Sequence, residues 1–356
     1  MNVGCLNNER LSNFELLRIL AMFLIVLHHC IIHGVFPYWF DNSSALAHIN
    51  NSMCFILSSV GKIGVTLFVL LSGYFFYDFR LKKWFDIYIK TLFFSVSILV
   101  ICSFIFPVKL PLASVKASLF PFIYNSYWFI TTYLILYAFS PLLNKILNNS
   151  SERIMRIYLI LGAVFWVILP YFGFNGTGYS NLVWFMYLYL LGASIKLGYL
   201  TFLRKYLGFL SCGIFGYTVV LSTTTFFLAG EHIRLNRFFS YVDLNSPYTL
   251  IISLWIFYLF KDLKMRNPAV NRCASSMFGV YLLHDNNLIR PCLWHVLLGM
   301  DTKMDSHFFI VWAFTASVGV FVFCILLDKI LSLIYVPLIN YIERQLSRIK
   351  IWRKIF

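Results

Sequence analysis

Ionisable side chains interrupt the first apolar run of the sequence, where contact with lipid makes an unpaired charge costly. The run FELLRILAMFLIVLHH contains Glu15, Arg18, His28 and His29. Residues three apart share a helical face, so Glu15 and Arg18 are expected to pair. Arg18 and His29 are eleven positions apart, which is about three turns and returns to within ~20° of the same face. His28 points elsewhere, which makes His29 the better candidate for chemistry.

A further histidine lies near the end of a later apolar run, SSMFGVYLLHDNNLIR. With a rise of about 1.5 Å per residue, His29 and His284 are predicted ~25 Å and ~18 Å above the inner ends of their helices, both in the outer half of a bilayer. Asp285 and the asparagines after it mark the end of the helix. Because imidazole titrates near neutral pH, two histidines from different helices can form a general-base site. Neither belongs to an HExxH or comparable pattern, so the sequence predicts no metal site.

The elements that position these residues are predicted to be membrane helices. Of the 356 residues, 60% are hydrophobic and only 12% are charged, whereas about a quarter of the residues of a soluble domain are charged. The mean hydropathy is +0.78. Apolar runs continue along the chain without a polar module or a long linker. The sequence therefore predicts one all-α, polytopic integral membrane domain over residues 1–356.

Ten apolar runs are close to the ~20 residues that an α-helix needs to cross a bilayer. They cover residues 12–33, 55–77, 84–107, 126–147, 154–172, 179–198, 206–229, 246–261, 273–288 and 307–337. The eighth and ninth runs are short, and the tenth is long enough to tilt or to continue along the inner surface.

The net charge of +15 follows the pattern of a membrane protein and not that of a nucleic-acid-binding protein. Lys and Arg residues cluster between the apolar runs, with nineteen in the segments predicted inside and six in those predicted outside. This asymmetry places both termini in the cytoplasm, in agreement with an even number of spans. The partner expected from the composition is the lipid bilayer, and no nucleic acid is expected.

The second run, GKIGVTLFVLLSGYFFYDFRLKK, contains small residues and a hydroxyl among its apolar side chains. Gly61, Gly64 and Gly73 permit the close approach of a neighbouring helix or a ligand. Ser72 is predicted near the level of Arg18. Small residues in membrane helices usually serve packing, and we favour this interpretation over a catalytic Ser72.

Three stretches carry a resemblance to a known family: FELLRILAMFLIVLHH, GVTLFVLLSGYFF and SSMFGVYLLHDN. Together with the ten predicted spans, they resemble acyltransferase family 3, whose bacterial members are membrane proteins that modify surface and extracellular sugars. The opening pattern of that family is an acidic residue, two residues, arginine, ten residues and histidine. Glu15, Arg18 and His29 fit this spacing, with Glu15 where aspartate is common.

The resemblance implies transfer of an acyl group, commonly acetyl from acetyl-CoA, to a hydroxyl of a cell-surface, exported or lipid-linked glycan. His29 is then the catalytic histidine, Arg18 belongs to the donor-side pore, and Ser72 belongs to the second-span motif. A basic inner mouth of Arg18, Lys82 and Lys83, with Arg80 beside them, suits the CoA phosphates. No bound cofactor is implied, because acetyl-CoA or another acyl-CoA is the donor substrate. The expected location is the bacterial cell membrane, crossed many times.

The sequence departs from the family after the second run. Many members have two arginines, two residues, an arginine and later a proline there, whereas this chain reads KKWFDIYI. Lys82 and Lys83 replace the first pair, Asp86 replaces the later arginine and Ile89 the proline. Details of CoA binding at the inner surface therefore do not carry over directly.

Two questions stay open at the level of sequence. His29 can act as a base toward the acceptor hydroxyl, with His284 assisting, or it can carry the acyl group covalently. The alternative function is a transporter or flippase for a glycan or lipid-linked sugar, because intramembrane arginine and histidine also suit a substrate path. The absence of matching inverted halves favours the acyltransferase.

Overall fold

The computed structural model describes residues 11–35, 45–76, 78–105, 110–174, 176–228, 243–346 and 348, and within them every regular element is helical. The long helices are α1 (Ser12–Gly34), α2 (Ala45–Phe75), α3 (Leu81–Ile105), α5 (Trp128–Asn149), α9 (Arg204–Leu228) and α14 (Phe309–Leu346). The shorter helices are α4 (Leu112–Leu119), α6 (Glu152–Ala163), α7 (Leu169–Tyr171), α8 (Asn181–Lys196), α11 (Pro247–Asp262), α12 (Pro268–Ala274) and α13 (Met277–His284). Single π or 3-10 turns span Val164–Ile168, Thr201–Leu203, Cys292–Leu297 and Met300–Lys303.

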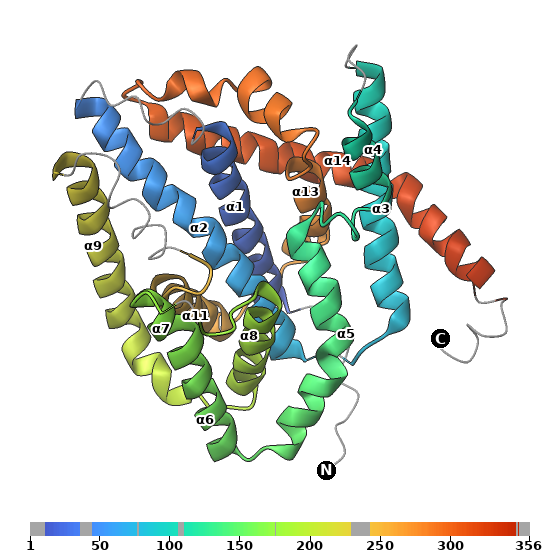
Figure 1. The fold of residues 1–356 in the computed structure, drawn as a ribbon. Coiled ribbons are helices and arrows are strands. Elements are labelled where there is room, and N and C mark those ends of the chain that lie inside the picture. Colours follow the sequence, from blue (N-terminus) through green and yellow to red (C-terminus); the bar gives the residue numbers. More distant parts are fainter. Residues whose placement is uncertain are drawn as a thin grey trace.

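The helices α1 and α2 run through the middle of the bundle (Figure 1). Helices α8, α9 and α11 cover one side of this pair, and α3, α5 and α13 lie toward the other side. Helix α14 crosses the bundle obliquely, as its predicted length allows. The two helices that carry the candidate site, α1 and α13, are therefore enclosed by other helices.

The described residues contain seven helices that are long and apolar enough to cross a membrane. They include α1, most of α2, α3, α5, α9, α14 and the segment Glu152–Tyr171. This result confirms a multi-pass membrane protein, whereas the ten predicted spans and the orientation of the termini remain predictions. The other three predicted spans correspond to shorter helices, because α8 and α11 have 16 residues each and α13 has only 8.

Helix α2 begins at Ala45, ten residues before residue 55, where hydropathy places the start of the second span. Polar residues occupy this additional part of the helix, which is why hydropathy alone begins the segment too late. The structure satisfies one of them inside the protein: the Asn50 amide donates to the carbonyls of Met304 (2.6 Å) and Ser306 (3.1 Å). A polar side chain that is hydrogen-bonded by protein does not end a buried helix.

The ninth predicted span, residues 273–288, is not one helix. Helix α12 ends at Ala274 and α13 begins at Met277, with a turn between them in which the Ser276 amide donates to the Cys273 carbonyl. The C-terminal end of α13 agrees with the sequence prediction, because the helix ends at His284, directly before Asp285. His284 consequently lies at the C-terminal end of a short helix that is packed among others.

Glycines set how closely α2 approaches its neighbours. A Cβ atom on Gly73 would overlap the Tyr189 carbonyl of α8, and one on Gly192 would overlap the Leu70 carbonyl of α2. On the other side of α2, Gly64 lies directly against the Ala21 carbonyl of α1. Backbone-to-backbone packing of this kind suits membrane helices, where burial of apolar surface from lipid contributes little. The predicted role of these small residues in helix packing is confirmed.

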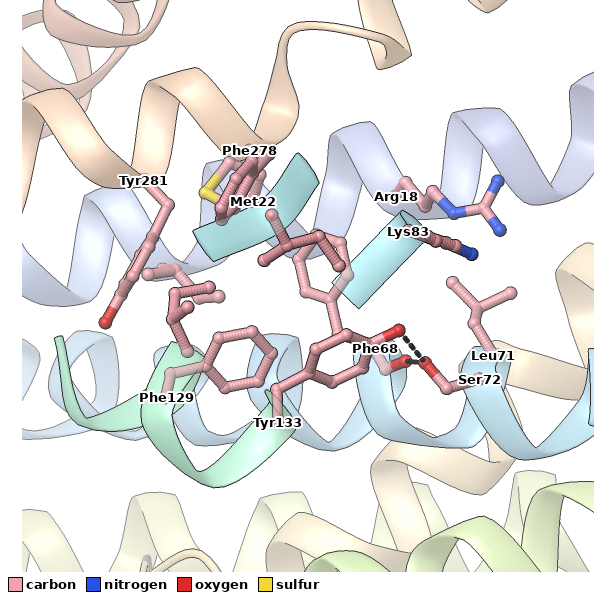
Figure 2. A pocket seen from close by; sticks show the side chains of 13 residues that line it. Arg18, Met22, Phe68, Leu71, Ser72, Lys83, Phe129, Tyr133, Phe278 and Tyr281 are labelled. Carbon is pink, nitrogen blue, oxygen red and sulfur yellow. Dashed lines mark hydrogen bonds between the residues drawn. The ribbon is translucent and has the colours of Figure 1, made fainter. Parts of the chain in front are cut away.

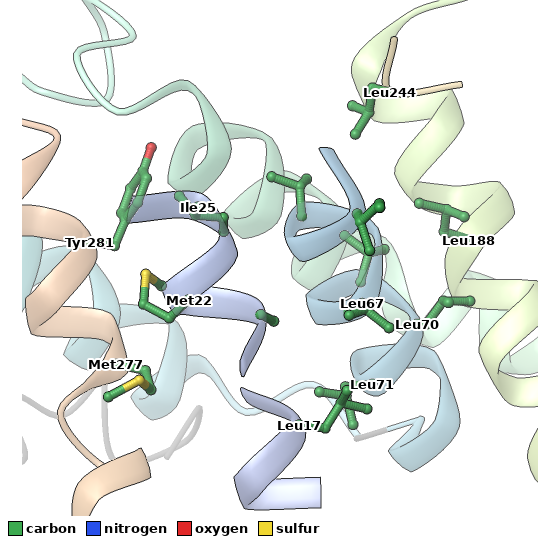
Figure 3. Packing of buried hydrophobic residues seen from close by; sticks show 14 of the residues in the cluster. Leu17, Met22, Ile25, Leu67, Leu70, Leu71, Leu188, Leu244, Met277 and Tyr281 are labelled. Atoms are coloured by element: carbon green, nitrogen blue, oxygen red, sulfur yellow. The ribbon is translucent and has the colours of Figure 1, made fainter. Parts of the chain in front are cut away.

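Apolar side chains fill the spaces between these helices (Figure 3). Leu17, Met22 and Ile25 of α1 are at most 4% exposed. They face buried residues of α2 on one side, such as Leu67, and of α13 on the other, such as Met277. The packing fixes the rotation of α1 and therefore the directions of its polar side chains.

A buried ion pair ties α13 to α3 and α14. Lys90 of α3 contacts Asp328 of α14 at 3.0 Å and donates to the Tyr335 hydroxyl at 2.8 Å. Asp328 is 2% exposed and lies against Gly279 of α13, where a Cβ atom would overlap its carboxylate. Because the carboxylate is held by two partners, it cannot move aside cheaply.

We expect Gly279→Ala to destabilise the protein by about 1–3 kcal/mol, because the added methyl group overpacks this interface. Thermal unfolding of the detergent-purified protein measures the effect. Gly216→Ala in α9 is the matched control, since nothing lies within 4 Å of a Cβ atom there. Equal melting temperatures for the two variants would contradict the prediction.

Candidate active site

The structure brings His29 and His284 into direct contact. His29 Nδ1 lies 2.9 Å from His284 Nε2, and the two rings are 5.0 Å apart. Both residues are buried, with exposures of 7% and 1%. Helix α1 supplies the first histidine and the end of α13 supplies the second, so the expected meeting of two histidines from different helices is observed.

The backbone of α13 determines which nitrogen of each ring carries a proton when both rings are neutral. His284 Nδ1 lies 2.6 Å from the Val280 carbonyl oxygen, which can only accept a hydrogen bond. His284 Nδ1 is therefore the donor and its Nε2 is an acceptor. His29 Nδ1 must then donate to that acceptor, which leaves the lone pair of His29 on Nε2. His29 is thus arranged as a base, and His284 orients it.

A carboxylate completes this arrangement. Asp285 Oδ1 lies 3.4 Å from His29 Nδ1, and its own charge is balanced by Arg290 at 2.9 Å. His33, one turn after His29, approaches the same oxygen at 3.9 Å. A carboxylate beside the protonated nitrogen stabilises the imidazolium that forms when the other nitrogen takes a proton. The sequence pattern indicates Asp285 only as a helix end and does not single out His33 or Arg290, although the four-residue step from His29 to His33 is a usable signal.

The side chains of His29, His33 and Asp285 place their ligand atoms within 4.8 Å of one another, which is close enough to share a metal ion. The surroundings fit a hydrogen-bond network better. Arg290 places a fixed positive charge on the Asp285 oxygen, and His29 Nδ1 already faces His284. A divalent cation would have to displace both contacts. We therefore assign the cluster to hydrogen bonding.

His28 has a different environment from its neighbour, as its position on the helix predicts. Its Nδ1 contacts the Ser58 carbonyl of α2, and its side chain packs on Gly61. His28 thus joins α1 to α2 on the side of α1 that faces away from α13. The choice of His29 as the histidine of the site agrees with this geometry.

A cavity of about 330 Å³ lies below the histidine pair, between α1, α2, α3, α5 and α13 (Figure 2). Arg18 and Lys83 lie together at one end, and Tyr281 lies at the other. Its walls are almost entirely apolar or aromatic. The cavity reaches Ile25, one turn before His29, and Tyr281, whose ring contacts that of His284 at 6.2 Å. One face of α1 therefore runs along the cavity from Arg18 toward His29.

The remaining predicted residues take distinct places. Glu15 pairs with Arg18, as expected from their spacing. Ser72 lines the cavity, but its hydroxyl donates to the Phe68 carbonyl at 3.0 Å and lies 3.4 Å from the Tyr133 hydroxyl. The Ser72 hydroxyl is therefore hydrogen-bonded within the cavity wall, in agreement with the interpretation of Ser72 as a packing residue.

The two adjacent lysines separate. Lys83 lines the cavity beside Arg18, with its Nζ atom 5.5 Å from the ring centre of Tyr137. Lys82 points away and forms an ion pair with Glu343 of α14 at 3.0 Å. Of the residues expected at the basic mouth, Arg18 and Lys83 therefore line the cavity.

These observations define a multi-pass membrane protein with a buried, oriented histidine above an apolar cavity that has a cationic end. Comparison with known families gives a match to the acyltransferase domain of the acyltransferase 3 type over residues 11–329, which is nearly the whole chain. The chain belongs to this family, and it is a membrane acyltransferase. No curated protein and no solved structure gives a match.

Proposed function

We propose that this protein transfers an acyl group, in the simplest case acetyl from acetyl-CoA, to a hydroxyl of a surface or exported glycan at the bacterial cell membrane. The observation that carries the proposal is the cavity, because it extends from two cationic side chains to Ile25 and Tyr281, which lie next to the histidine pair. Arg18 and Lys83 suit the phosphates of CoA through charge-assisted contacts. The apolar walls suit the uncharged arm and the acyl thioester, and His29 suits the acceptor hydroxyl.

In the proposed reaction His29 Nε2 takes the proton of the acceptor hydroxyl while that oxygen attacks the thioester carbonyl. The new C–O bond forms, the C–S bond breaks, and the departing thiolate receives the proton from His29. Asp285 and His284 stabilise the imidazolium between these two proton transfers. Because His29 Nδ1 is occupied by His284, only Nε2 serves the reaction.

Radiolabelled acetyl-CoA supplied to inside-out membrane vesicles that contain the protein tests the proposed function. We expect label to enter alkali-labile esters of the envelope glycan, and to stay in CoA in vesicles that lack the protein. If an intact glycan crosses the bilayer while no acyl label moves, the protein is a transporter and the proposal is wrong.

The adjacent lysines provide a test of the donor site. We expect Lys83→Ala to raise the KM for acetyl-CoA about 10-fold or more, since a hydrogen bond to a charged group contributes about 1.5–3 kcal/mol. Lys82→Ala removes the same charge one residue earlier, outside the cavity, where Lys82 forms a partly exposed pair with Glu343, which contributes little. Initial rates at varied acetyl-CoA concentrations measure both variants. An equal KM for the two would remove Lys83 from the donor site.

A further inference from the structure

A second cavity, of about 230 Å³, lies beside the residues that follow His284. Helices α3 and α4, the turn before α5 and the segment after α13 form its walls. Its polar lining consists of short hydroxyl and amide side chains, namely Ser95, Ser114, Ser118, Ser126, Asn286 and Asn287. None of the described residues that line it is ionisable. The lining thus differs in kind from the apolar, cationic-ended cavity described above.

One buried side chain stands between the two cavities. The Tyr127 hydroxyl accepts a hydrogen bond from Asn286, which lines the second cavity, at 2.7 Å. The Tyr127 ring lies 6.0 Å from that of Tyr281, which lines the first cavity. Tyr127 is 1% exposed and also donates to the Leu282 carbonyl. Tyr127 therefore contacts one lining residue of each cavity, next to the histidine pair.

The second cavity also lies beside the segment that contacts His29. Asn286 directly follows Asp285, whose carboxylate lies 3.4 Å from His29 Nδ1. A ligand in the second cavity lies beside the segment that follows Asp285, whereas Arg18 and Lys83 lie at the end of the first cavity away from Tyr281. A two-substrate transfer needs both reactants held close to the base.

The chemistry of the lining selects the kind of ligand. Ser118 is 5% exposed, lines the cavity, and has no hydrogen-bond partner among the described residues. Hydroxyl and amide groups both donate and accept, so they match a ligand that carries many hydroxyls. An anion would find no counter-charge in this lining, and an alkyl chain would leave the buried hydroxyl unpaired at a cost of about 1–3 kcal/mol.

We propose that this cavity is the acceptor site and binds a neutral, polyhydroxylated sugar unit of the glycan that is acylated. The inference rests on the proposed transfer to a glycan hydroxyl. Donor and acceptor then occupy separate cavities of different chemistry, and transfer takes place where these cavities meet at Tyr127 and the histidine pair.

The experiment fills the cavity and measures each substrate separately. Ser118→Leu places an apolar side chain in the cavity, and Ser114→Leu does the same from a less buried position. Thr177→Leu is the matched control, because Thr177 lines a different cavity, with Tyr171 and Asp243. The acceptor probe is surface polysaccharide from cells that lack the protein, freed of ester groups by mild alkali. Initial rates with radiolabelled acetyl-CoA give the KM for each substrate.

We expect Ser118→Leu and Ser114→Leu to raise the KM for the polysaccharide about 10-fold or more, with the KM for acetyl-CoA unchanged and Thr177→Leu like wild type. A wild-type acceptor KM in both serine variants overturns the inference. So does a rise in Thr177→Leu alone, which would move the acceptor to the other cavity. Should Ser118→Leu fail to fold, Ser114→Leu decides.

A binding measurement separates failure of this inference from failure of the proposed function. In Ser118→Cys, a small membrane-impermeant maleimide is expected to label the cavity above the background of the native cysteines. The polysaccharide is expected to slow the labelling at least several-fold, and CoA is not. Protection without any acyl transfer would refute the proposed transfer but retain the glycan site. Transfer in the wild type without protection in the variant would refute the site.

Discussion

Replacing His29 with alanine is expected to lower kcat for acyl transfer by about 10²- to 10⁴-fold, the usual contribution of a positioned general base. The reason is geometric. His284 holds His29 Nδ1, so Nε2 is the nitrogen left to take a proton. The KM for acetyl-CoA is expected to stay within a few-fold of wild type, because Arg18 and Lys83 lie at the far end of the cavity. Initial rates of label transfer at saturating substrate measure the effect.

Two glutamine variants control for folding. His29→Gln keeps a side-chain N–H that can donate to His284 but offers no base, and we expect it to be as inactive as the alanine variant. His28→Gln makes the same change one residue earlier, where the ring contacts the Ser58 carbonyl, and we expect near wild-type rates. A folded His29→Gln protein that transfers label at the wild-type rate would remove His29 from the reaction.

Replacing His284 with alanine is expected to lower kcat about 10²-fold, because His29 loses the acceptor that fixes its tautomer and its ring orientation. His284 is a positioning residue in this account: its Nδ1 is committed to the Val280 carbonyl, and its Nε2 to His29. The loss should therefore appear in kcat, with the KM values for donor and acceptor within a few-fold of wild type.

The conservative variant distinguishes positioning from packing. The side-chain oxygen of glutamine can accept the hydrogen bond from His29 Nδ1, so we expect His284→Gln to recover a substantial part of the lost rate. Methionine has a similar volume and only a weak acceptor, so His284→Met should not recover it. Equal rates for the two variants would show that His284 merely fills space.

Local spacing was sufficient for the parts of the site that lie on one helix. The three-residue step from Glu15 to Arg18 predicted their ion pair, and the eleven-residue step from Arg18 to His29 predicted one shared face. The same periodicity separated His28 from His29. These predictions succeeded because the geometry of a single helix depends only on its own backbone.

Helix boundaries and contacts between helices were harder to predict from the sequence. The start of α2 was predicted ten residues too late because its polar first turns are satisfied by the segment near Met304, which hydropathy does not represent. The predicted ninth span, residues 273–288, contains the end of α12 at Ala274, a turn, and the short helix α13. At α2 the competing factor was hydrogen bonding to a distant part of the chain, and between α12 and α13 it was a local turn.

The sequence by itself determined that this is a multi-pass membrane protein of the acyltransferase 3 family, with Arg18 and His29 on one helical face. Only the tertiary structure decided that His284 orients His29 and that Lys83, rather than its neighbour Lys82, joins Arg18 in the cavity. The physical reason is that helical periodicity is local, whereas the rotation and depth of each helix are set by the close packing of its neighbours.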